Sequence, residues 1–440
     1  MIKYLPLLIA VIFFACHEAK VTETSDTSSN GIIVSSDLNH FYNAFDAIHQ
    51  TSDSLKRLDL LQELFLEKAS PGQNRMIEAR NYQPHEYVTA MTTQKAFWSD
   101  LRKNTEKLEI FNTQLLNGVE KIKGLYKNHK STTLYYTIGC HRSPGTGVPG
   151  MVMIGSEFAL GDTTMNVEQL RPYNQGYYKM NPVDHLELLI VHEYVHTQQG
   201  EMVHNLLCLT LYEGIAEFVA QLVTKKESPF KAFTYGPEHE DYVREQFEIQ
   251  MYNPGGLRNW LWNSDRNLFG TADMSYYVGY RIASLYYDQA EDKEKALAEL
   301  IELDLNDDPQ VTKIVESSGY LTKGLDELYS NFEKNRPRVV RIEGFPEDFK
   351  NIDPVTNTIT IHFSEPMNPD HRGFDYGPIG ESGVLRVTGV KGFSDDQKSL
   401  TVNIELLPGH HHQMLITNRF ISETGYALEP YLLDVETKTF

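Results

Sequence analysis

The chain has 440 residues, 41% of them hydrophobic and 23% charged, which is an ordinary globular composition with enough apolar residues for at least one large core. Its 60 acidic and 40 basic residues leave a formal charge of −20, which disfavours nucleic acid as a partner because phosphate backbones are repelled. Three cysteines exclude a disulfide-framework protein, and no apolar run approaches the roughly 18 residues of a membrane-spanning helix.

The first residues have the pattern of an export signal. A short basic start is followed by the apolar run Tyr4–Ala15, which has the length of a signal-peptide core, and Cys16 comes directly after it. This arrangement resembles a bacterial lipobox, which implies a lipoprotein signal peptide over residues 1–16 and a lipid on Cys16. An ordinary cleaved signal peptide with an incidental cysteine is the alternative. Residues 17–36 are rich in Ser and Thr and predict a flexible tether to a membrane of the bacterial cell envelope, at the outer membrane or cell surface.

Export also bears on the other two cysteines. Cys140 and Cys208 would lie in an oxidising compartment, where two thiols can form a disulfide. Two separate buried thiols are the alternative, and the sequence leaves the choice open.

Residues 37–336 carry mostly helical patterns, with apolar residues at helical spacing in the first hundred residues and in four later stripes. Between these parts, residues 134–139 and 151–155 are β-like, and residues 143–150 form a turn-rich loop of Ser, Pro, Gly and Thr. The pattern predicts a helical domain that contains a small β-sheet. The later helical stripes cover residues 186–198, 209–224, 276–290 and 294–303.

The pattern changes at Arg336 and Pro337, after which short alternating runs are separated by Gly, Pro, Asn and Asp. Strands of this length and spacing predict an all-β sandwich over residues 337–440. Within it, residues 357–368 (NTITIHFSEPMN) resemble the bacterial Ig-like module, which implies a spacer or docking function. The predicted fold class is α+β: a mostly helical domain over 37–336 with a small β-sheet, followed by an all-β Ig-like sandwich.

Residues 192–196 read HEYVH, an HExxH motif inside a helical stripe. Residues four apart share one face of a helix, so His192 and His196 can bind one metal ion. Glu193 can then reach a water on that ion and act as its base. Asn181, which is followed by proline, is the predicted N-cap of this helix.

A catalytic zinc needs a third protein ligand and an open position for water. The stripe over 209–224 offers Glu213, 17 residues after His196, which leaves room for a turn between two helices. Glu217 lies one helical turn further along the same face, where it can accept a hydrogen bond from a ligand histidine. Because the connecting turn is short, a ligand role for Glu217 in place of Glu213 stays open.

Together these motifs resemble the gluzincin metallopeptidases, which carry HExxH on one helix and a glutamate ligand in an E-G-x-A pattern on the next, as at residues 213–216. The resemblance covers roughly residues 130–290, and the 17-residue gap is slightly shorter than is usual in that group. It implies Zn²⁺ ligands at His192, His196 and Glu213, a general base at Glu193, and a supporting carboxylate at Glu217.

A donor for the oxyanion is expected opposite the metal. Tyr276-x-x-Gly279 resembles the Y-x-x-G of the aminopeptidase branch of the gluzincins, which implies that Tyr276 stabilises the oxyanion. Tyr276 lies at the edge of an apolar stripe, so its hydroxyl can point into a cleft. Tyr277 is the alternative donor, and plain aromatic packing is the alternative role.

Two further stretches bear on the function. Residues 150–155 are the candidate edge strand for pairing with substrate backbone. This stretch has no carboxylate before Glu157 that could hold a free substrate amine. An endopeptidase is therefore expected more than an aminopeptidase. Residues 410–412 are a second histidine cluster, which predicts a hairpin turn more than a metal site because no acid or thiol lies near it in sequence.

The sequence thus predicts an exported, lipid-anchored zinc metallopeptidase that hydrolyses peptide or protein substrates and has no nucleic-acid partner. The alternative is a non-enzymatic surface protein that binds or adheres through its Ig-like module and retains a metal site. The intact Glu193 favours the enzyme, because a binding protein has no need of a base beside two metal ligands.

Overall fold

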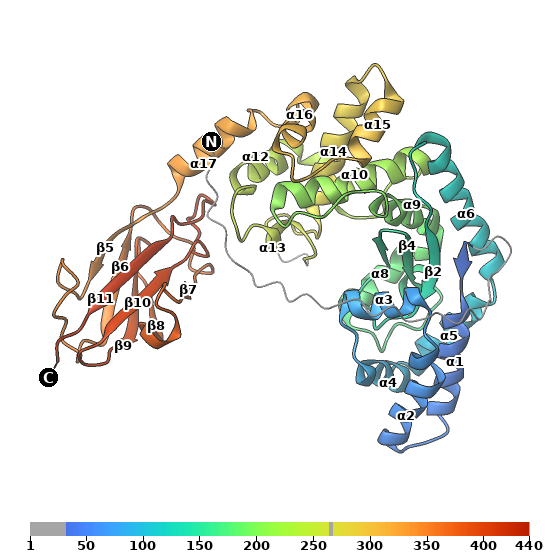
Figure 1. The fold of residues 1–440 in the computed structure, drawn as a ribbon, viewed down its shortest axis with the longest axis horizontal. Coiled ribbons are helices and arrows are strands. Elements are labelled where there is room, and N and C mark those ends of the chain that lie inside the picture. Colours follow the sequence, from blue (N-terminus) through green and yellow to red (C-terminus); the bar gives the residue numbers. More distant parts are fainter. Residues whose placement is uncertain (1–31, 264–266, 440) are drawn as a thin grey trace.

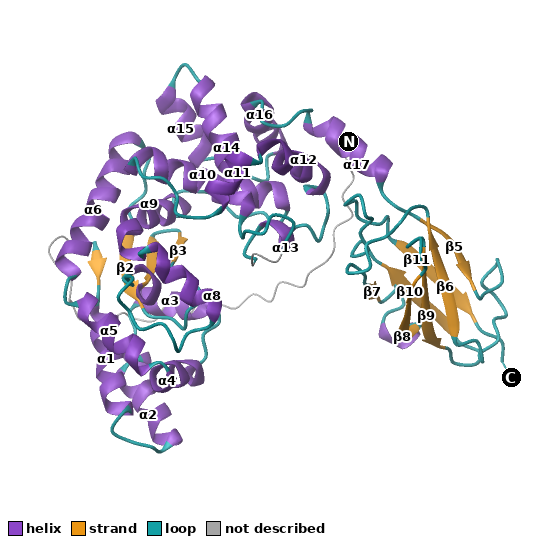
Figure 2. Cartoon of the chain, turned by 180° about the vertical axis from the view of Figure 1, so that it is seen from behind, coloured by secondary structure: helices purple, strands orange, loops and turns teal. Residues whose placement is uncertain are grey.

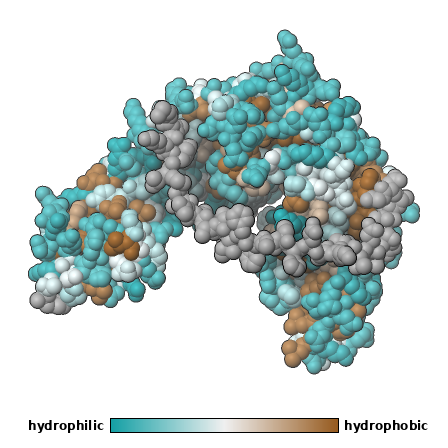
Figure 3. Space-filling model, in the orientation of Figure 1, coloured by the Kyte–Doolittle hydropathy of each residue, from teal (hydrophilic) through white to brown (hydrophobic). Residues whose placement is uncertain are grey.

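The computed structural model describes residues 32–263 and 267–439, which form a mixed α+β chain. Its elements follow an arc, with the first helices at one end and the C-terminal strands at the other (Figure 1). Cys16 and most of the expected tether lie outside the described residues. The face drawn in Figure 3 is mostly hydrophilic, which fits a chain with a formal charge of −20.

Helices α1 to α6 form the N-terminal end of the arc. Side-chain caps mark the N-termini of two of them. The Asp53 carboxylate caps α2 by accepting a hydrogen bond from Leu55 N at 2.9 Å, and the Ser70 side chain caps α3. Buried rings such as Phe41 and Trp98, 4.7 Å apart, join these helices in one core. The bounds are α1 (Ser36–Ile48), α2 (Ser54–Leu64), α3 (Pro71–Arg80), α4 (Pro84–Thr93), α5 (Lys95–Thr105) and α6 (Leu108–Leu125).

A small sheet with the strand order β1-β2-β4-β3 follows these helices. β2 and β4 run parallel, whereas β3 is antiparallel to β4, with Gly145 opposite Ile154. β4 is therefore interior and β3 is the edge strand, so the turn-rich loop over 143–150 and the edge strand over 150–155 were wrong predictions. Gly145 and Gly147 are typical turn residues, but in this structure they allow β3 to pack closely against the helix that carries Glu193 and His196. The bounds are β1 (Ile33–Val34), β2 (Thr133–Thr137), β3 (Gly145–Val148) and β4 (Met151–Gly155).

Three helices form the centre of the fold, and α10 is buried along almost its whole length. In the part of the chain that is described, α10 is long and apolar enough to cross a membrane, but 89% of its apolar stretch is buried inside the protein. Two glycines let α10 and α14 cross closely, because a Cβ on Gly214 would lie 2.2 Å from Gly279 Cα. The bounds are α9 (Leu186–His196), α10 (Leu206–Thr224) and α14 (Met274–Gln289).

The HExxH helix begins later than the sequence predicted. Residues Pro182–His185 form a 3-10 turn, and α9 starts only at Leu186. Asn181 has a left-handed backbone with φ 52°, and its side chain accepts from Thr163 N and donates to Asp184. Asn181 is therefore not the N-cap of α9, because its amide group fixes a neighbouring loop.

Shorter helices surround this centre. They are α7 (Ser156–Ala159), α8 (Pro172–Tyr177), α11 (Ala232–Glu238), α12 (Glu240–Gln250), α13 (Leu257–Trp260), α15 (Lys293–Ile301), α16 (Asp308–Ser318) and α17 (Leu325–Asn335), with 3-10 turns η1 (Leu66–Lys68), η2 (Tyr178–Met180), η3 (Pro182–His185) and η4 (Glu381–Gly383).

After α17 the chain forms two sheets, β5-β6-β9-β8 and β11-β10-β7, which Figure 2 shows gathered at one end of the molecule. Side chains from both sheets share one hydrophobic core that is separate from the helical core. Residues 406–410 connect β9 of one sheet to β10 of the other, so the hairpin expected at the histidine cluster is a crossing between sheets. The bounds are β5 (Val339–Glu343), β6 (Thr358–Phe363), β7 (Phe374–Asp375), β8 (Arg386–Phe393), β9 (Ser399–Glu405), β10 (His411–Ile416) and β11 (Tyr431–Glu436).

Hydrogen bonds join the strand part to the helical part. The Asn253 side chain donates to Gly425 O at 2.7 Å and accepts from Ala427 N at 3.0 Å. The Arg336 guanidinium donates to Leu428 O at 2.8 Å. The two parts are therefore joined by hydrogen bonds between side chains and backbone groups as well as by the connecting chain.

Candidate metal centre

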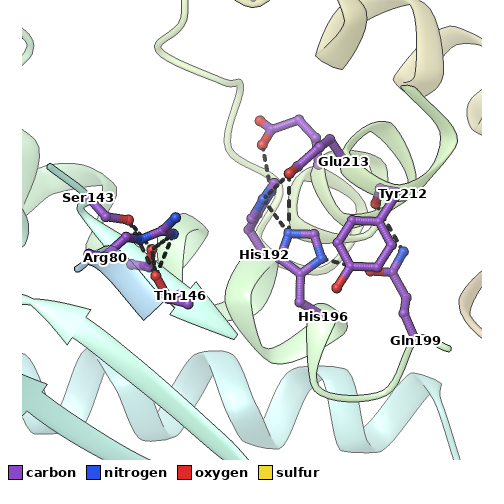
Figure 4. A network of polar contacts seen from close by, with 10 residues as sticks. Arg80, Ser143, Thr146, His192, His196, Gln199, Tyr212 and Glu213 are labelled. Carbon is purple, nitrogen blue, oxygen red and sulfur yellow. Dashed lines mark hydrogen bonds and ion pairs between the residues drawn. The ribbon is translucent and has the colours of Figure 1, made fainter. Parts of the chain in front are cut away.

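The HExxH histidines and one glutamate of α10 meet in the buried space between α9 and α10 (Figure 4). His192 Nε2 and His196 Nε2 lie 3.1 Å apart, and Glu213 Oε2 lies 3.4 Å from the first and 3.2 Å from the second. Glu217 contacts the opposite nitrogen of His192 and stays outside this group. The converging carboxylate is thus that of Glu213, although the sequence left Glu217 open for this position.

The outer nitrogen of each imidazole is held by a neighbouring acceptor. His192 Nδ1 lies 3.0 Å from Glu217 Oε2, and His196 Nδ1 lies 2.7 Å from Gln199 Oε1. Gln199 Nε2 donates to Tyr212 O at 3.0 Å, which turns its oxygen toward the histidine. When Nδ1 is the donor in a neutral imidazole, Nε2 is left with the lone pair that a metal ion needs.

With both imidazoles neutral in this tautomer, the two Nε2 atoms and the Glu213 carboxylate are three converging acceptors, which a cation would bridge. An ion bound tetrahedrally at about 2.0–2.1 Å has ligand atoms about 3.3 Å apart, which follows from the geometry of a tetrahedron. The observed separations of 3.1, 3.2 and 3.4 Å match this spacing. Two imidazoles and a carboxylate suit a divalent transition metal, so the donor set fits a metal ion.

A proton on His192 is the alternative to a metal ion in this group. Burial would lower the pKa of His192, but hydrogen bonds to Glu213 and Glu217 raise it to about 10. Burial would raise the pKa of Glu213, but the charge on His196 and hydrogen bonds from both histidines hold it well below its usual range. A metal ion that binds here at neutral pH must therefore displace a proton from His192.

Glu193, the remaining acid of the motif, faces the edge strand β3. A Cβ on Gly145 would lie 2.6 Å from Glu193 Oε1, and a Cβ on Gly147 would lie 2.2 Å from the Glu193 carbonyl oxygen. Only glycine at these two positions lets β3 lie this close to α9. The outcome is an edge strand directly beside the Glu193 carboxylate.

Glu157, the first carboxylate after β4, has no access to this space. It is fully buried and accepts from Gly139 N at 3.0 Å and from His141 N at 3.2 Å. Burial raises the pKa of Glu157 to about 7, against the lowering effect of these backbone hydrogen bonds. Its contacts show that Glu157 anchors the loop that leads into β3.

The two candidate tyrosines of α14 point in different directions. The Tyr276 ring lies 6.0 Å from the His192 ring, with 15° between their planes. Burial and the negative charge of Glu213 raise the pKa of the Tyr276 hydroxyl well above its usual value, so the hydroxyl stays protonated. The Tyr277 ring packs edge-on against Phe233, at 5.8 Å. Tyr276 therefore adjoins the metal-binding group, and Tyr277 does not.

Sequence reasoning missed several residues around this group. Gln199 follows His196 by three residues, and this helical spacing was its only signal. Trp262 and Asp273 have left-handed backbones, with φ 49° and 59°, and Trp262 N donates to Asp273 Oδ1 at 2.5 Å just before α14. Burial raises the pKa of Asp273 to about 6. Strained non-glycine residues of this kind gather at functional sites, but no sequence pattern marks them.

The other candidate residues lie elsewhere. Cys140 and Cys208 are free thiols, so they do not form the disulfide that the sequence left open. In the second histidine cluster, His411 pairs with Asp434 at the surface and His412 Nε2 accepts from Leu407 N at 3.0 Å. Within residues 32–263 and 267–439, the group of His192, His196 and Glu213 is the one cluster of such residues that could hold a metal ion.

Neither a family model nor a curated protein sequence matches this chain. Among solved structures, two of the surface-layer protein SbsC are 13% identical to it, with a TM-score of 0.18. Each covers 61% of this chain, which spans only 38% of theirs. The N-terminal part of the bacterial S-layer protein SbsC is 10% identical over 90% of this chain and 68% of its own, also with a TM-score of 0.18. Similarity this low carries no argument about fold or function.

Proposed function

We propose that this protein is a zinc-dependent peptidase, an endopeptidase, carried on an exported and lipid-anchored chain. The observation that carries the proposal is the convergence of His192 Nε2, His196 Nε2 and Glu213 Oε2 within 3.4 Å of one another, with Glu193 next to them in the chain. This is the arrangement that the resemblance to gluzincins implies: two histidines from one helix and a glutamate from the next.

Zinc suits this donor set better than other common ions. Magnesium and calcium bind mainly through oxygen atoms, and structural zinc sites close all four positions with protein ligands. Two histidines and one glutamate leave a position open, as in catalytic sites of peptidases. A zinc ion held here would supply Lewis acidity, which lowers the pKa of a water to about 7 and polarises a substrate carbonyl.

The chain's own residues supply the rest of the chemistry. Glu193 is placed to take a proton from the attacking water and to pass it to the leaving amine. Tyr276 stays protonated and is placed to donate to the oxygen that becomes negative. Glu217 and Gln199 hold the two imidazoles in orientation. The edge strand β3 offers backbone groups to an extended peptide.

Cleavage inside a chain is favoured over removal of the first residue. An aminopeptidase needs a carboxylate near the scissile bond to hold the free amine of its substrate. Glu157 is the nearest acid in sequence to the sheet edge, and it is fully buried on backbone amides of the loop before β3. This supports the endopeptidase.

The proposal extends to the rest of the chain. The lipobox-like start assigns a lipid anchor to Cys16 and a place in the bacterial cell envelope. Two sheets of short strands around one core support an Ig-like module over 337–440, which would act as a spacer or docking unit. The substrate is a peptide or protein, because the acidic surface disfavours nucleic acid.

Metal analysis combined with a cleavage assay tests the proposal on the soluble form, residues 17–440. The wild-type chain should bind one zinc and cleave casein or a peptide library, whereas Glu193→Gln should keep the zinc and lose the cleavage. His196→Ala should lose zinc affinity severely. Stoichiometric zinc without any Glu193-dependent cleavage would contradict the peptidase and favour a surface-binding protein.

A further inference from the structure

An arginine of α3 contacts the edge strand β3. Arg80 is the last residue of α3, and its Nη2 donates to Thr146 Oγ1 at 2.6 Å and weakly to Gly145 O at 3.4 Å. Ser143 Oγ donates to the same Gly145 carbonyl. Figure 4 draws this group beside the ligand histidines, with the guanidinium nitrogens on the side toward His192. The guanidinium therefore contacts only neutral oxygen atoms.

No carboxylate of the described residues pairs with Arg80, although its neighbours are paired. Arg75 on the same helix lies 2.6 Å from Glu78, and Arg142 forms an ion pair with Glu86. The side chain of Arg80 is half-buried, and its Nε is buried without any hydrogen-bond partner. A partly desolvated cation that lacks a counter-ion is unfavourable, and an incoming anion would relieve it.

The unpaired guanidinium lies close to the proposed chemistry. Gly145 links the two, since its carbonyl contacts Arg80 and a Cβ on its Cα would touch the Glu193 carboxylate. With ordinary bond lengths, Arg80 Nη2 is no more than about 10 Å from Glu193 Oε1. An extended peptide advances about 3.3 Å per residue, so the distance from the guanidinium to the Glu193 carboxylate corresponds to about three residues or fewer.

We propose that Arg80 forms a carboxylate-binding subsite for the peptide substrate, a proposal that rests on the peptidase function. The guanidinium fork matches a carboxylate in two parallel hydrogen bonds, and Thr146 holds it in place from the strand. On a chain with a charge of −20, this positive position selects where a negative substrate group can dock. The carboxylate comes either from the C-terminus of the peptide or from an Asp or Glu side chain near the scissile bond.

Matched substrates distinguish the two sources. Both arms measure kcat/KM for a peptide that the enzyme cleaves. The first arm compares a free C-terminus with a C-terminal amide. The second arm compares Asp or Glu with Asn or Gln at each position within three residues of the cleaved bond. The wild-type enzyme should prefer the carboxylate form in one arm by about 10- to 100-fold, as expected for a hydrogen-bonded charge pair. A preference in neither arm would overturn the subsite.

Three variants assign that preference. Arg80→Gln should abolish the preference, so that the ratio of kcat/KM for the carboxylate and neutral peptides falls to about one. Arg80→Lys should keep part of the preference, because lysine retains the charge without the fork. Arg75→Gln, a change of an exposed and paired arginine on the same helix, should keep the full preference. If Arg80 only supports β3, Arg80→Gln will slow both peptides equally, and the unchanged ratio would overturn the subsite.

A binding measurement separates this proposal from the peptidase function. Fluorescein-labelled peptides in the carboxylate and neutral forms are titrated with the Glu193→Gln protein, which should bind without cleaving. Tighter binding of the carboxylate form that Arg80→Gln removes would support the subsite even where wild-type protein shows no cleavage. Equal binding of both forms would overturn it, whether or not the chain is a peptidase.

Discussion

A methyl group added at Gly145 should disable the proposed base without disturbing the metal-binding group. The new Cβ would lie 2.6 Å from Glu193 Oε1, 2.7 Å from its Cγ and 2.8 Å from its Cδ. Ordinary contacts of this kind are about 3.4 Å or longer, so the carboxylate must move by about 1 Å. The backbone of Gly145 is not left-handed, so alanine tests the space alone.

A displacement of about 1 Å in a reacting group costs on the order of 10²-fold in rate. Gly145→Ala should therefore lower kcat about 100-fold, while zinc stoichiometry and the melting temperature stay near those of the wild type. His192, His196 and Glu213 are not among the closest contacts of the added methyl group, which is why metal binding should persist. The assay is peptide hydrolysis alongside metal analysis of the purified variant.

Gly147→Ala is the matched comparison on the same strand. Its Cβ would lie 2.2 Å from the Glu193 carbonyl oxygen and 2.8 Å from His196 Cβ, and a helix backbone cannot rotate away as a carboxylate can. This variant should lose about 1–3 kcal/mol of unfolding free energy or more, visible as a lower melting temperature. Full activity in Gly145→Ala, or equal loss of stability in both variants, would show that β3 does not position Glu193.

Four further outcomes are expected. Glu217→Gln should weaken zinc affinity by roughly 10- to 100-fold, because it orients a ligand imidazole, and a zinc titration against a competing chelator measures this. Tyr276→Phe should lower kcat by about 10²–10³-fold at unchanged zinc affinity, whereas Tyr277→Phe should stay active; two active variants would remove the oxyanion role. Glu157 has a folded pKa of about 7, above its unfolded value, so the folded chain binds more protons and this residue should lower the unfolding free energy as pH rises from about 4.5 to 7. Denaturant melts over this range should show that slope in the wild type and its absence in Glu157→Gln. A fragment of residues 337–440 should fold alone as an all-β unit, and a far-UV spectrum that shows mainly helix or no structure would contradict this.

The local parts of this protein could be read from its sequence. The stripe over 209–224 predicted a helix, and α10 spans Leu206–Thr224. Apolar residues at helical spacing indicate the buried face of a helix from the local sequence alone. The sequence also predicted the strands β2 and β4, the HExxH pair, and Glu213 as the carboxylate on the following helix. In each case the signal lies within one element.

Only the tertiary structure decided how these elements meet. Glu213 rather than Glu217 faces both histidines because of how α10 packs beside α9, and the spacing along α10 alone does not determine that packing. The close crossing of α10 and α14 likewise depends on Gly214 and Gly279, which are far apart in sequence. The same holds for β3. Its glycines predicted a turn from composition, but in the structure they allow the strand to pack closely against α9. The Gln199 side chain is oriented toward His196 by its hydrogen bond to the Tyr212 carbonyl of α10, a contact between two helices that no local pattern reveals.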